Sequence, residues 1–212
     1  MPSPSDAIES TELPPIPGTV EAAATLKLPT GFRRRIASFD AAIESKFDLL
    51  RGNPVADRVF YTASEVGDFG LIWHMITAAR GLRSDRDAND ALRVAVILGA
   101  ETVLVNGVIK SFFRRTRPDW EQNRAFRIRR PRSSSFPSGH ASSAFTAAGV
   151  LSQDDPLWPV YYAVAGIVAA SRVYVKIHHP SDVVAGIATG VVLAKVARRI
   201  WPQGASPWRA HK

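Results

Sequence analysis

Three short clusters of basic, hydroxyl and histidine side chains carry the chemistry that this sequence could perform. The first cluster reads KSFFRRTRP and occupies residues 110–118. Pro118 favours an extended exit from the preceding helix. Lys110 and Arg117 are therefore candidates to hold one anion together, although a solvated basic helix end has a similar composition.

The second cluster, FPSGH at residues 136–140, precedes an apolar run that begins at Ala141. Ser138 and Gly139 fall where a helix should begin, and the free N–H groups and dipole of a helix start favour an anion. Glycine also lets the backbone approach a ligand closely. His140 would then lie beside the bound anion. An ordinary Ser/Gly helix cap with an incidental histidine is the alternative interpretation.

The third cluster contains Arg172, followed by HHPSD at residues 178–182. Proline suits the first turn of a helix, so we expect His178 just before a helix and Asp182 in its first turn. A carboxylate there can accept from one imidazole nitrogen and leave the other free to attack an electrophile. The alternatives are a helix-start charge beside a bystander histidine, or a metal site formed by His178 and His179.

A metal site is the weaker alternative, because consecutive histidines rarely face one ion and no HExxH-like spacing is present. The sequence contains no cysteine, which excludes disulfides and cysteine-bearing metal sites. We therefore predict no metal and no cofactor. The net charge of +8 favours anionic partners such as phosphates, anionic lipids or nucleic acid.

The elements that must position these clusters are all predicted to be helical. Residues 32–50 carry apolar side chains at helical spacing, which predicts an amphipathic helix on a membrane surface or packed on the domain. Residues 55–66 predict a second amphipathic helix. The short apolar run 69–79 contains His74, which we interpret as a packing residue, and residues 80–90 are expected to form a charged turn.

The apolar segment 92–113 would extend about 33 Å as a helix, which matches a bilayer core. Glu101 and Asn106 lie within it and should face protein rather than lipid. Three further apolar runs follow at 141–151, 157–175 and 183–194. In the last run, Gly186 and Gly190 form a small-xxx-small pair suited to close helix packing.

These runs predict an all-α helical bundle with about five membrane-embedded helices and preceding amphipathic helices. Buried helices of a soluble bundle are the alternative. We predict a polar, disordered tail at 1–31, a single helical domain at 32–201 and a short basic tail at 202–212. No secretory signal peptide is visible at the N-terminus, which argues against a soluble periplasmic enzyme.

The joint order of the three clusters resembles the signature of the type 2 phosphatidic acid phosphatase superfamily. The resemblance covers about residues 55–200, and no signature position departs from it. It implies that Asp182 orients His178 for attack on phosphorus, and that His140 protonates the leaving oxygen and then activates water. The phosphate oxygens would be held by Lys110, Arg117, Ser138, Gly139 and Arg172.

We therefore expect an integral membrane phosphatase that needs no metal and hydrolyses phosphorylated lipids through a phosphohistidine intermediate, in a bacterial inner (plasma) membrane. Phosphatidic acid, phosphatidylglycerol phosphate, and polyprenyl phosphates or diphosphates are the expected substrate classes. One rival is a soluble acid phosphatase or vanadium haloperoxidase of the same superfamily. Another is a nucleic-acid-binding protein that uses the arginines of 114–132, but it leaves the histidine pattern unexplained.

We accordingly expect the membrane and a phosphorylated lipid as partners, and no nucleic acid. Arg129 and Arg130 are expected to form either a solvated basic face or a site for anionic lipid headgroups.

Overall fold

A computed structural model describes residues 29–118, residue 126 and residues 133–204. In this part of the chain every regular element is a helix, which confirms the predicted all-α class. The elements are α1 (Thr30–Asp48), α2 (Pro54–Val66), η1 (Asp68–Gly70), α3 (Leu71–Gly81), α4 (Asp85–Thr102), η2 (Val103–Val108), η3 (Ile109–Phe112), α5 (Gly139–Leu151), α6 (Trp158–Tyr174) and α7 (Pro180–Ile200).

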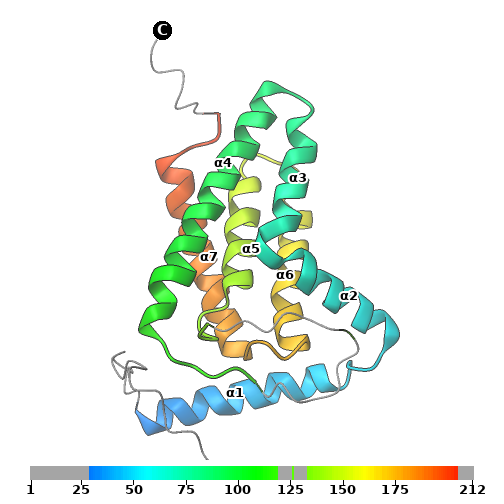
Figure 1. Ribbon diagram of the computed structural model, residues 1–212, viewed down its shortest axis with the longest axis vertical. Helices are drawn as coiled ribbons and strands as arrows, with labels where there is room; N and C mark the ends of the chain where they lie inside the picture. The colour runs from blue at the N-terminus through cyan, green and yellow to red at the C-terminus, as the bar shows by residue number, and fades with distance from the viewer. Residues whose placement is uncertain (1–28, 119–125, 127–132, 205–212) are drawn as a thin grey trace, which may run out of the picture.

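Helix α5 forms the centre of the bundle and packs against α4, α6 and α7. Nine of its 13 residues are buried, and most of these are Ala, Ser or Gly, so the neighbouring helices can approach closely. Figure 1 shows α3 to α7 running along the long axis of the molecule, while α1 lies across their lower end. Helix α2 connects α1 to this bundle.

Close contact between α5 and α7 depends on the two glycines that the sequence singled out. A Cβ atom on Gly186 would lie 2.4 Å from the carbonyl oxygen of Ser138, and one on Gly190 would lie 2.4 Å from that of Ser142. Because both neighbours are backbone atoms, neither can move aside without shifting α5. The predicted close helix packing is therefore confirmed, and it brings the second and third clusters together.

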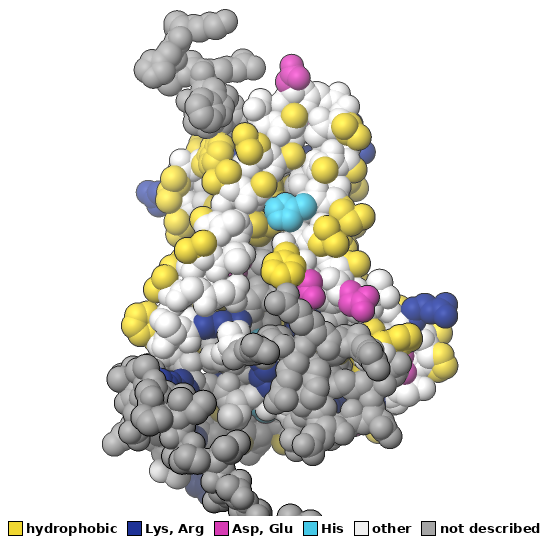
Figure 2. Space-filling view, in the orientation of Figure 1, with side chains coloured by type: hydrophobic (Ala, Val, Ile, Leu, Met, Phe, Trp, Pro, Cys, Tyr) yellow, Lys and Arg dark blue, Asp and Glu magenta, His cyan; other side chains and the backbone are white. Residues whose placement is uncertain are grey.

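Large hydrophobic side chains face outward on the bundle. Val103 and Phe112 on the long helical segment are 68% and 62% exposed, and Val192 on α7 is 58% exposed. In Figure 2, hydrophobic side chains spread over the upper part of the bundle, where α3 and α4 lie. Such an apolar exterior is typical of a protein that meets lipid rather than water.

One continuous helical segment, residues 85–112, is the only one in the described part of the chain that is both long and apolar enough to cross a membrane. Only 28% of its most apolar window is buried inside the protein, so most of it faces outward. The predicted number of membrane-embedded helices stays a prediction.

This long segment differs from the prediction in two ways. It begins at Asp85 rather than at residue 92, because the Ser84 hydroxyl accepts a hydrogen bond from the Asp87 N–H at 3.2 Å and caps the helix. The expected charged turn at 80–90 is therefore wrong except at residues 82–84, because α3 continues to Gly81 and α4 begins at Asp85. The segment also changes to a π-helix at Val103 and to a 3-10 helix at Ile109. Lys110 lies in this 3-10 helix and is buried.

The remaining predicted helices agree with the structure to within about three residues, except that α7 continues to Ile200, beyond the predicted run 183–194. The predicted tails lie outside the described residues apart from their inner ends: α1 already begins at Thr30, and residues 202–204 follow α7. Arg129 and Arg130, predicted as a basic face or a headgroup site, also lie outside the described residues.

We expect Gly186→Ala to destabilise the bundle, because the added methyl group would push α5 away from α7. Overpacking of this kind costs about 1–3 kcal/mol. Thermal unfolding of the detergent-purified protein should show a Tm several degrees below that of the wild type. Gly166→Ala on α6 is the matched control, since a Cβ there meets nothing within 4 Å. Equal Tm values for the two variants would contradict the tight contact.

Candidate active site

The three clusters meet at one cavity of about 920 Å³. Ser138 and Asp182 are both fully buried and adjoin lining residues: Ser138 precedes Gly139 in the chain, and Oδ2 of Asp182 is 3.7 Å from Nδ1 of His178. The Ser138 N–H donates to the Asp182 carbonyl oxygen at 3.0 Å. The structure thus brings all eight predicted residues together. Those lining the cavity are Lys110, Arg117, Gly139, His140, Arg172 and His178.

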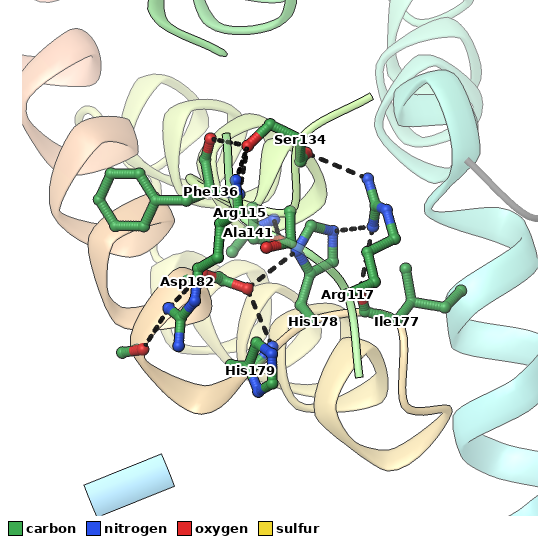
Figure 3. Close-up of polar contacts among 12 residues, drawn as sticks. Arg115, Arg117, Ser134, Phe136, Ala141, Ile177, His178, His179 and Asp182 are labelled. Carbon is green, nitrogen blue, oxygen red and sulfur yellow. Dashed lines mark hydrogen bonds and ion pairs between the residues drawn. The ribbon is translucent and has the colours of Figure 1, made fainter. Parts of the chain in front are cut away.

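His178 lies in the loop between α6 and α7 and presents its two ring nitrogens to different partners (Figure 3). Its Nδ1 is 3.7 Å from Oδ2 of Asp182, which is longer than a hydrogen bond. Its Nε2 is 3.2 Å from Nη1 of Arg117. Because a guanidinium can only donate, Nε2 must be the accepting nitrogen, which assigns the ring proton to Nδ1 and directs it toward Asp182.

Burial also fixes the charge of His178. The residue is 2% exposed, and the pKa of His178 is lowered to about 3, with burial as the largest cause. Asp182 raises this pKa, whereas the positive charges of Arg172 and Arg117 act with burial to lower it. The imidazole is therefore neutral at physiological pH, with a lone pair on Nε2, as a nucleophile requires.

The Asp182 carboxylate is held at both oxygens. Oδ1 accepts from Nη1 of Arg115 at 2.6 Å, and Oδ2 accepts from the His179 N–H at 3.0 Å. Pro180 occupies the first position of α7, so His178 precedes the helix and Asp182 lies in its first turn, as the sequence predicts. The orientation of Asp182 toward His178 is thus set by neighbours on two separate segments.

His140, in the first turn of α5, has an acidic partner that is absent from the predicted set. Its Nε2 is 2.6 Å from Oδ1 of Asp68, which lies in the turn between α2 and α3. Phe69 and Gly70 both adopt left-handed backbone conformations there, with φ values of 54° and 68°. Each catalytic histidine candidate therefore faces its own carboxylate. The flanking glycines of GDFG indicate a turn, but nothing in the sequence links that turn to His140.

Both predicted phosphate-binding arginines form hydrogen bonds to neutral groups. Arg172, which is 2% exposed, donates from Nη1 to the carbonyl oxygen and hydroxyl of Ser64. Arg117 donates to the carbonyl oxygens of Ser133 at 3.1 Å and Ile177 at 3.0 Å. Hydrogen bonds to carbonyl groups orient a guanidinium without cancelling its charge. The cavity wall therefore keeps a concentrated positive charge suited to a phosphate.

The Ser138 hydroxyl accepts from the Ala141 N–H at 3.5 Å and caps α5. Ser138 is not among the described residues that line the cavity, whereas Gly139 is. A Cβ on Gly139 would come within 2.9 Å of Asn106 Oδ1, so glycine keeps this wall open. The predicted role of the Ser138 hydroxyl at the phosphate stays a prediction.

Three further polar residues that the sequence analysis discussed also line this cavity. Glu101 is 3% exposed and faces protein as predicted, and Asn106 lines the cavity beside Gly139. His74, interpreted as a packing residue, is half-buried and lines the cavity as well. Within the described residues no group of three His, Cys, Asp or Glu side chains is placed to hold a metal ion. Metal independence stays a prediction.

A cationic cavity in a helical bundle, lined by two histidines that each face a carboxylate, is suited to phosphoryl transfer. The family model of the PAP2 superfamily matches residues 90–204, and the chain belongs to this superfamily, as its three clusters predict.

Two bacterial phosphatases are among the curated relatives of this chain. The chain is 31% identical over 152 residues to the decaprenylphosphoryl-5-phosphoribose phosphatase of Mycobacterium tuberculosis (strain H37Rv), covering 70% of this chain and 81% of the relative. It is 28% identical over 171 residues to phosphatidylglycerophosphatase B of Bacillus subtilis (strain 168), covering 74% and 81%.

Two solved structures share the fold. The transmembrane PAP2 type phosphatidylglycerolphosphate phosphatase from Bacillus subtilis aligns with a TM-score of 0.62 at 26% identity, covering 78% of this chain and 86% of that one. LpxE from Aquifex aeolicus aligns with a TM-score of 0.57 at 26% identity, covering 73% and 93%.

We expect Asp68→Asn to lower kcat/KM by roughly ten- to a hundredfold, because His140 would lose the carboxylate that orients it and favours its protonated form. The loss should shrink with an activated aryl phosphate, whose leaving group needs no proton. Glu65→Gln is the control, since Glu65 is exposed one turn earlier. Steady-state kinetics on both substrates measures the effect. An equal loss on both substrates would argue against a role of Asp68 in leaving-group protonation.

Proposed function

We propose that this protein is a membrane phosphatase that hydrolyses lipid phosphate monoesters or diphosphates through a phosphohistidine intermediate on His178. The observation that carries the proposal is the placement of Nε2 of His178 at the cationic cavity while Nδ1 faces Asp182. The PAP2 relatives support the class, a hydrolase acting on lipid phosphate esters in a membrane. A bacterial inner membrane as its location is part of the proposal.

In the first step, Nε2 of His178 attacks phosphorus, and the bond from phosphorus to the leaving oxygen breaks. His140 gives its proton to that oxygen, so a monoester releases a neutral alcohol and a diphosphate releases a protonated lipid phosphate. Arg117, Arg172 and Lys110 stabilise the charge that develops on the non-bridging oxygens. The proton on Nδ1 of His178 remains directed at Asp182, which stabilises the positive charge on the ring.

In the second step, His140 acts as a base and removes a proton from water, whose oxygen attacks the phosphorus of the phosphohistidine. The bond between phosphorus and nitrogen breaks, inorganic phosphate forms, and His178 returns to its neutral state. The proton taken by His140 restores the acid needed for the next cycle. Asp68 is placed to support both states of His140 at 2.6 Å.

The lipid character of the substrate is supported by the surroundings of the cavity. Its lining continues from the catalytic residues to apolar groups of α4, including Ala95 and Leu98, and to Phe69. The phosphate end of a lipid could thus reach His178 while its apolar part follows α4 outward. The curated relatives act on decaprenylphosphoryl-5-phosphoribose and on phosphatidylglycerophosphate by name. We retain phosphatidic acid, phosphatidylglycerol phosphate and polyprenyl phosphates as candidates.

A soluble acid phosphatase or haloperoxidase is less well supported, because a solved structural neighbour is a transmembrane lipid phosphatase and the bundle exterior is apolar. The expectation of no nucleic-acid partner stays a prediction.

We expect long-chain phosphatidic acid to be hydrolysed with a kcat/KM roughly a hundredfold or more above that of glycerol 3-phosphate, which carries the same reacting group. Binding of the remote lipid tail can be used to lower the barrier at phosphorus. Released phosphate is measured in detergent micelles, with His178→Ala as the inactive control. Matched kcat/KM values for the two substrates would refute the lipid assignment, while phosphate release by His178→Ala would refute the mechanism.

A further inference from the structure

Helix α1 carries a buried carboxylate where an amphipathic helix would bury an apolar side chain. Among the residues of α1, all of which the structure describes, Asp40 is the one buried residue, at 5% exposure. Phe32 and Phe39 on the same helix are 51% and 43% exposed. Burying a carboxylate is costly unless it is paired and hydrogen-bonded, so the partners of Asp40 must account for this arrangement.

Those partners belong to the first cluster and to the start of α7. Oδ1 of Asp40 accepts from the Ser181 N–H at 2.7 Å. Oδ2 accepts from Nη2 of Arg115 at 2.7 Å and from the Ser181 hydroxyl at 2.9 Å. Asp40 therefore binds the residue next to Asp182 and, through Arg115, reaches Asp182 itself.

Arg115 joins the two carboxylates with separate nitrogens. While Nη2 binds Asp40, Nη1 donates to Oδ1 of Asp182 at 2.6 Å and to the Ser181 hydroxyl at 2.7 Å. Arg115 is not among the described residues that line the cavity, in contrast to Arg117 two positions later. Its charge is shared between two carboxylates, so it is not placed to hold phosphate.

We propose that Arg115, held by Asp40, is a positioning residue that fixes the Asp182 carboxylate against His178, and that α1 is therefore part of the active site. This inference rests on the roles proposed above for Asp182 and His178. With Oδ1 bound to Arg115 and Oδ2 bound to the His179 N–H, the carboxylate has one orientation. Without Arg115, Oδ1 of Asp182 would be buried without a hydrogen-bond partner, and the Asp182 carboxylate would rotate away from His178.

The test measures kcat and KM of the full-length protein in detergent with ³²P-labelled phosphatidic acid. Arg115→Gln and Asp40→Asn should each lower kcat by roughly ten- to a hundredfold, as expected for a misplaced catalytic group, and leave KM within about twofold. Arg115→Lys should fall between them and the wild type, because an ammonium lacks the planar fork that spans two carboxylates.

Glu44→Gln is the matched control. Glu44 lies one turn after Asp40 on α1, and its Oε1 is 3.1 Å from Nδ1 of His179, so it contacts the same loop without contacting Arg115. Its kcat should stay within about twofold of the wild type. If Glu44→Gln lowers kcat as much as Asp40→Asn, general docking of α1 explains the effect and the positioning role is wrong.

A double-mutant cycle separates positioning from a structural role. In the Asp182→Asn background, adding Arg115→Gln should change kcat by less than about twofold, because the residue it positions is already altered. Losses that multiply would overturn the inference, as would wild-type kcat in Arg115→Gln. If Arg115→Gln fails to fold, the same cycle with Asp40→Asn decides by the same criterion. Wild-type kcat in Asp182→Asn would instead overturn the proposed function.

Discussion

The buried Asp182 carboxylate is the interaction on which the arrangement of the site depends. A carboxylate with no exposed surface must have its oxygens satisfied by protein groups. Asp182 meets this requirement with Arg115 and the His179 N–H, while its backbone oxygen accepts from the Ser138 N–H. These contacts join the start of α7 to the first cluster and to the start of α5. The close approach of α5 and α7 at Gly186 is what makes them possible.

The arginines of the site differ in their hydrogen-bond partners. Arg115 forms ion pairs with the carboxylates of Asp40 and Asp182, so its charge is compensated within the protein. Arg117 and Arg172 are held mainly by carbonyl and hydroxyl oxygens, so their charge remains available in the cavity. This difference in hydrogen-bond partners supports the different roles proposed for Arg115 and Arg117, which are only two residues apart in the chain.

The periodicity of apolar residues was sufficient to predict the helical class. The placement of His178 and Asp182 could also be predicted, because Pro180 marks the start of α7 and the two residues are only four positions apart. The contacts of Asp68 and Asp40 could not be derived in this way. Asp68 is 72 residues from His140, and Asp40 is 141 residues from Ser181. No periodicity encodes such pairs. The helix cap at Ser84 differs from these long-range contacts, because a serine followed by acidic residues is a local signal for a helix start. The charged residues there were interpreted as a turn instead.

The central claim is a covalent bond between phosphorus and His178, and rapid-quench labelling tests it most directly. The enzyme is mixed with ³²P-labelled phosphatidic acid, quenched within milliseconds and mapped as peptides at high pH, where phosphohistidine survives and is distinguished from a phosphoserine ester. Label on the peptide that contains His178, lost in His178→Ala, is the predicted result. Label on Ser138, or a single-step inversion of configuration at phosphorus, would contradict the account.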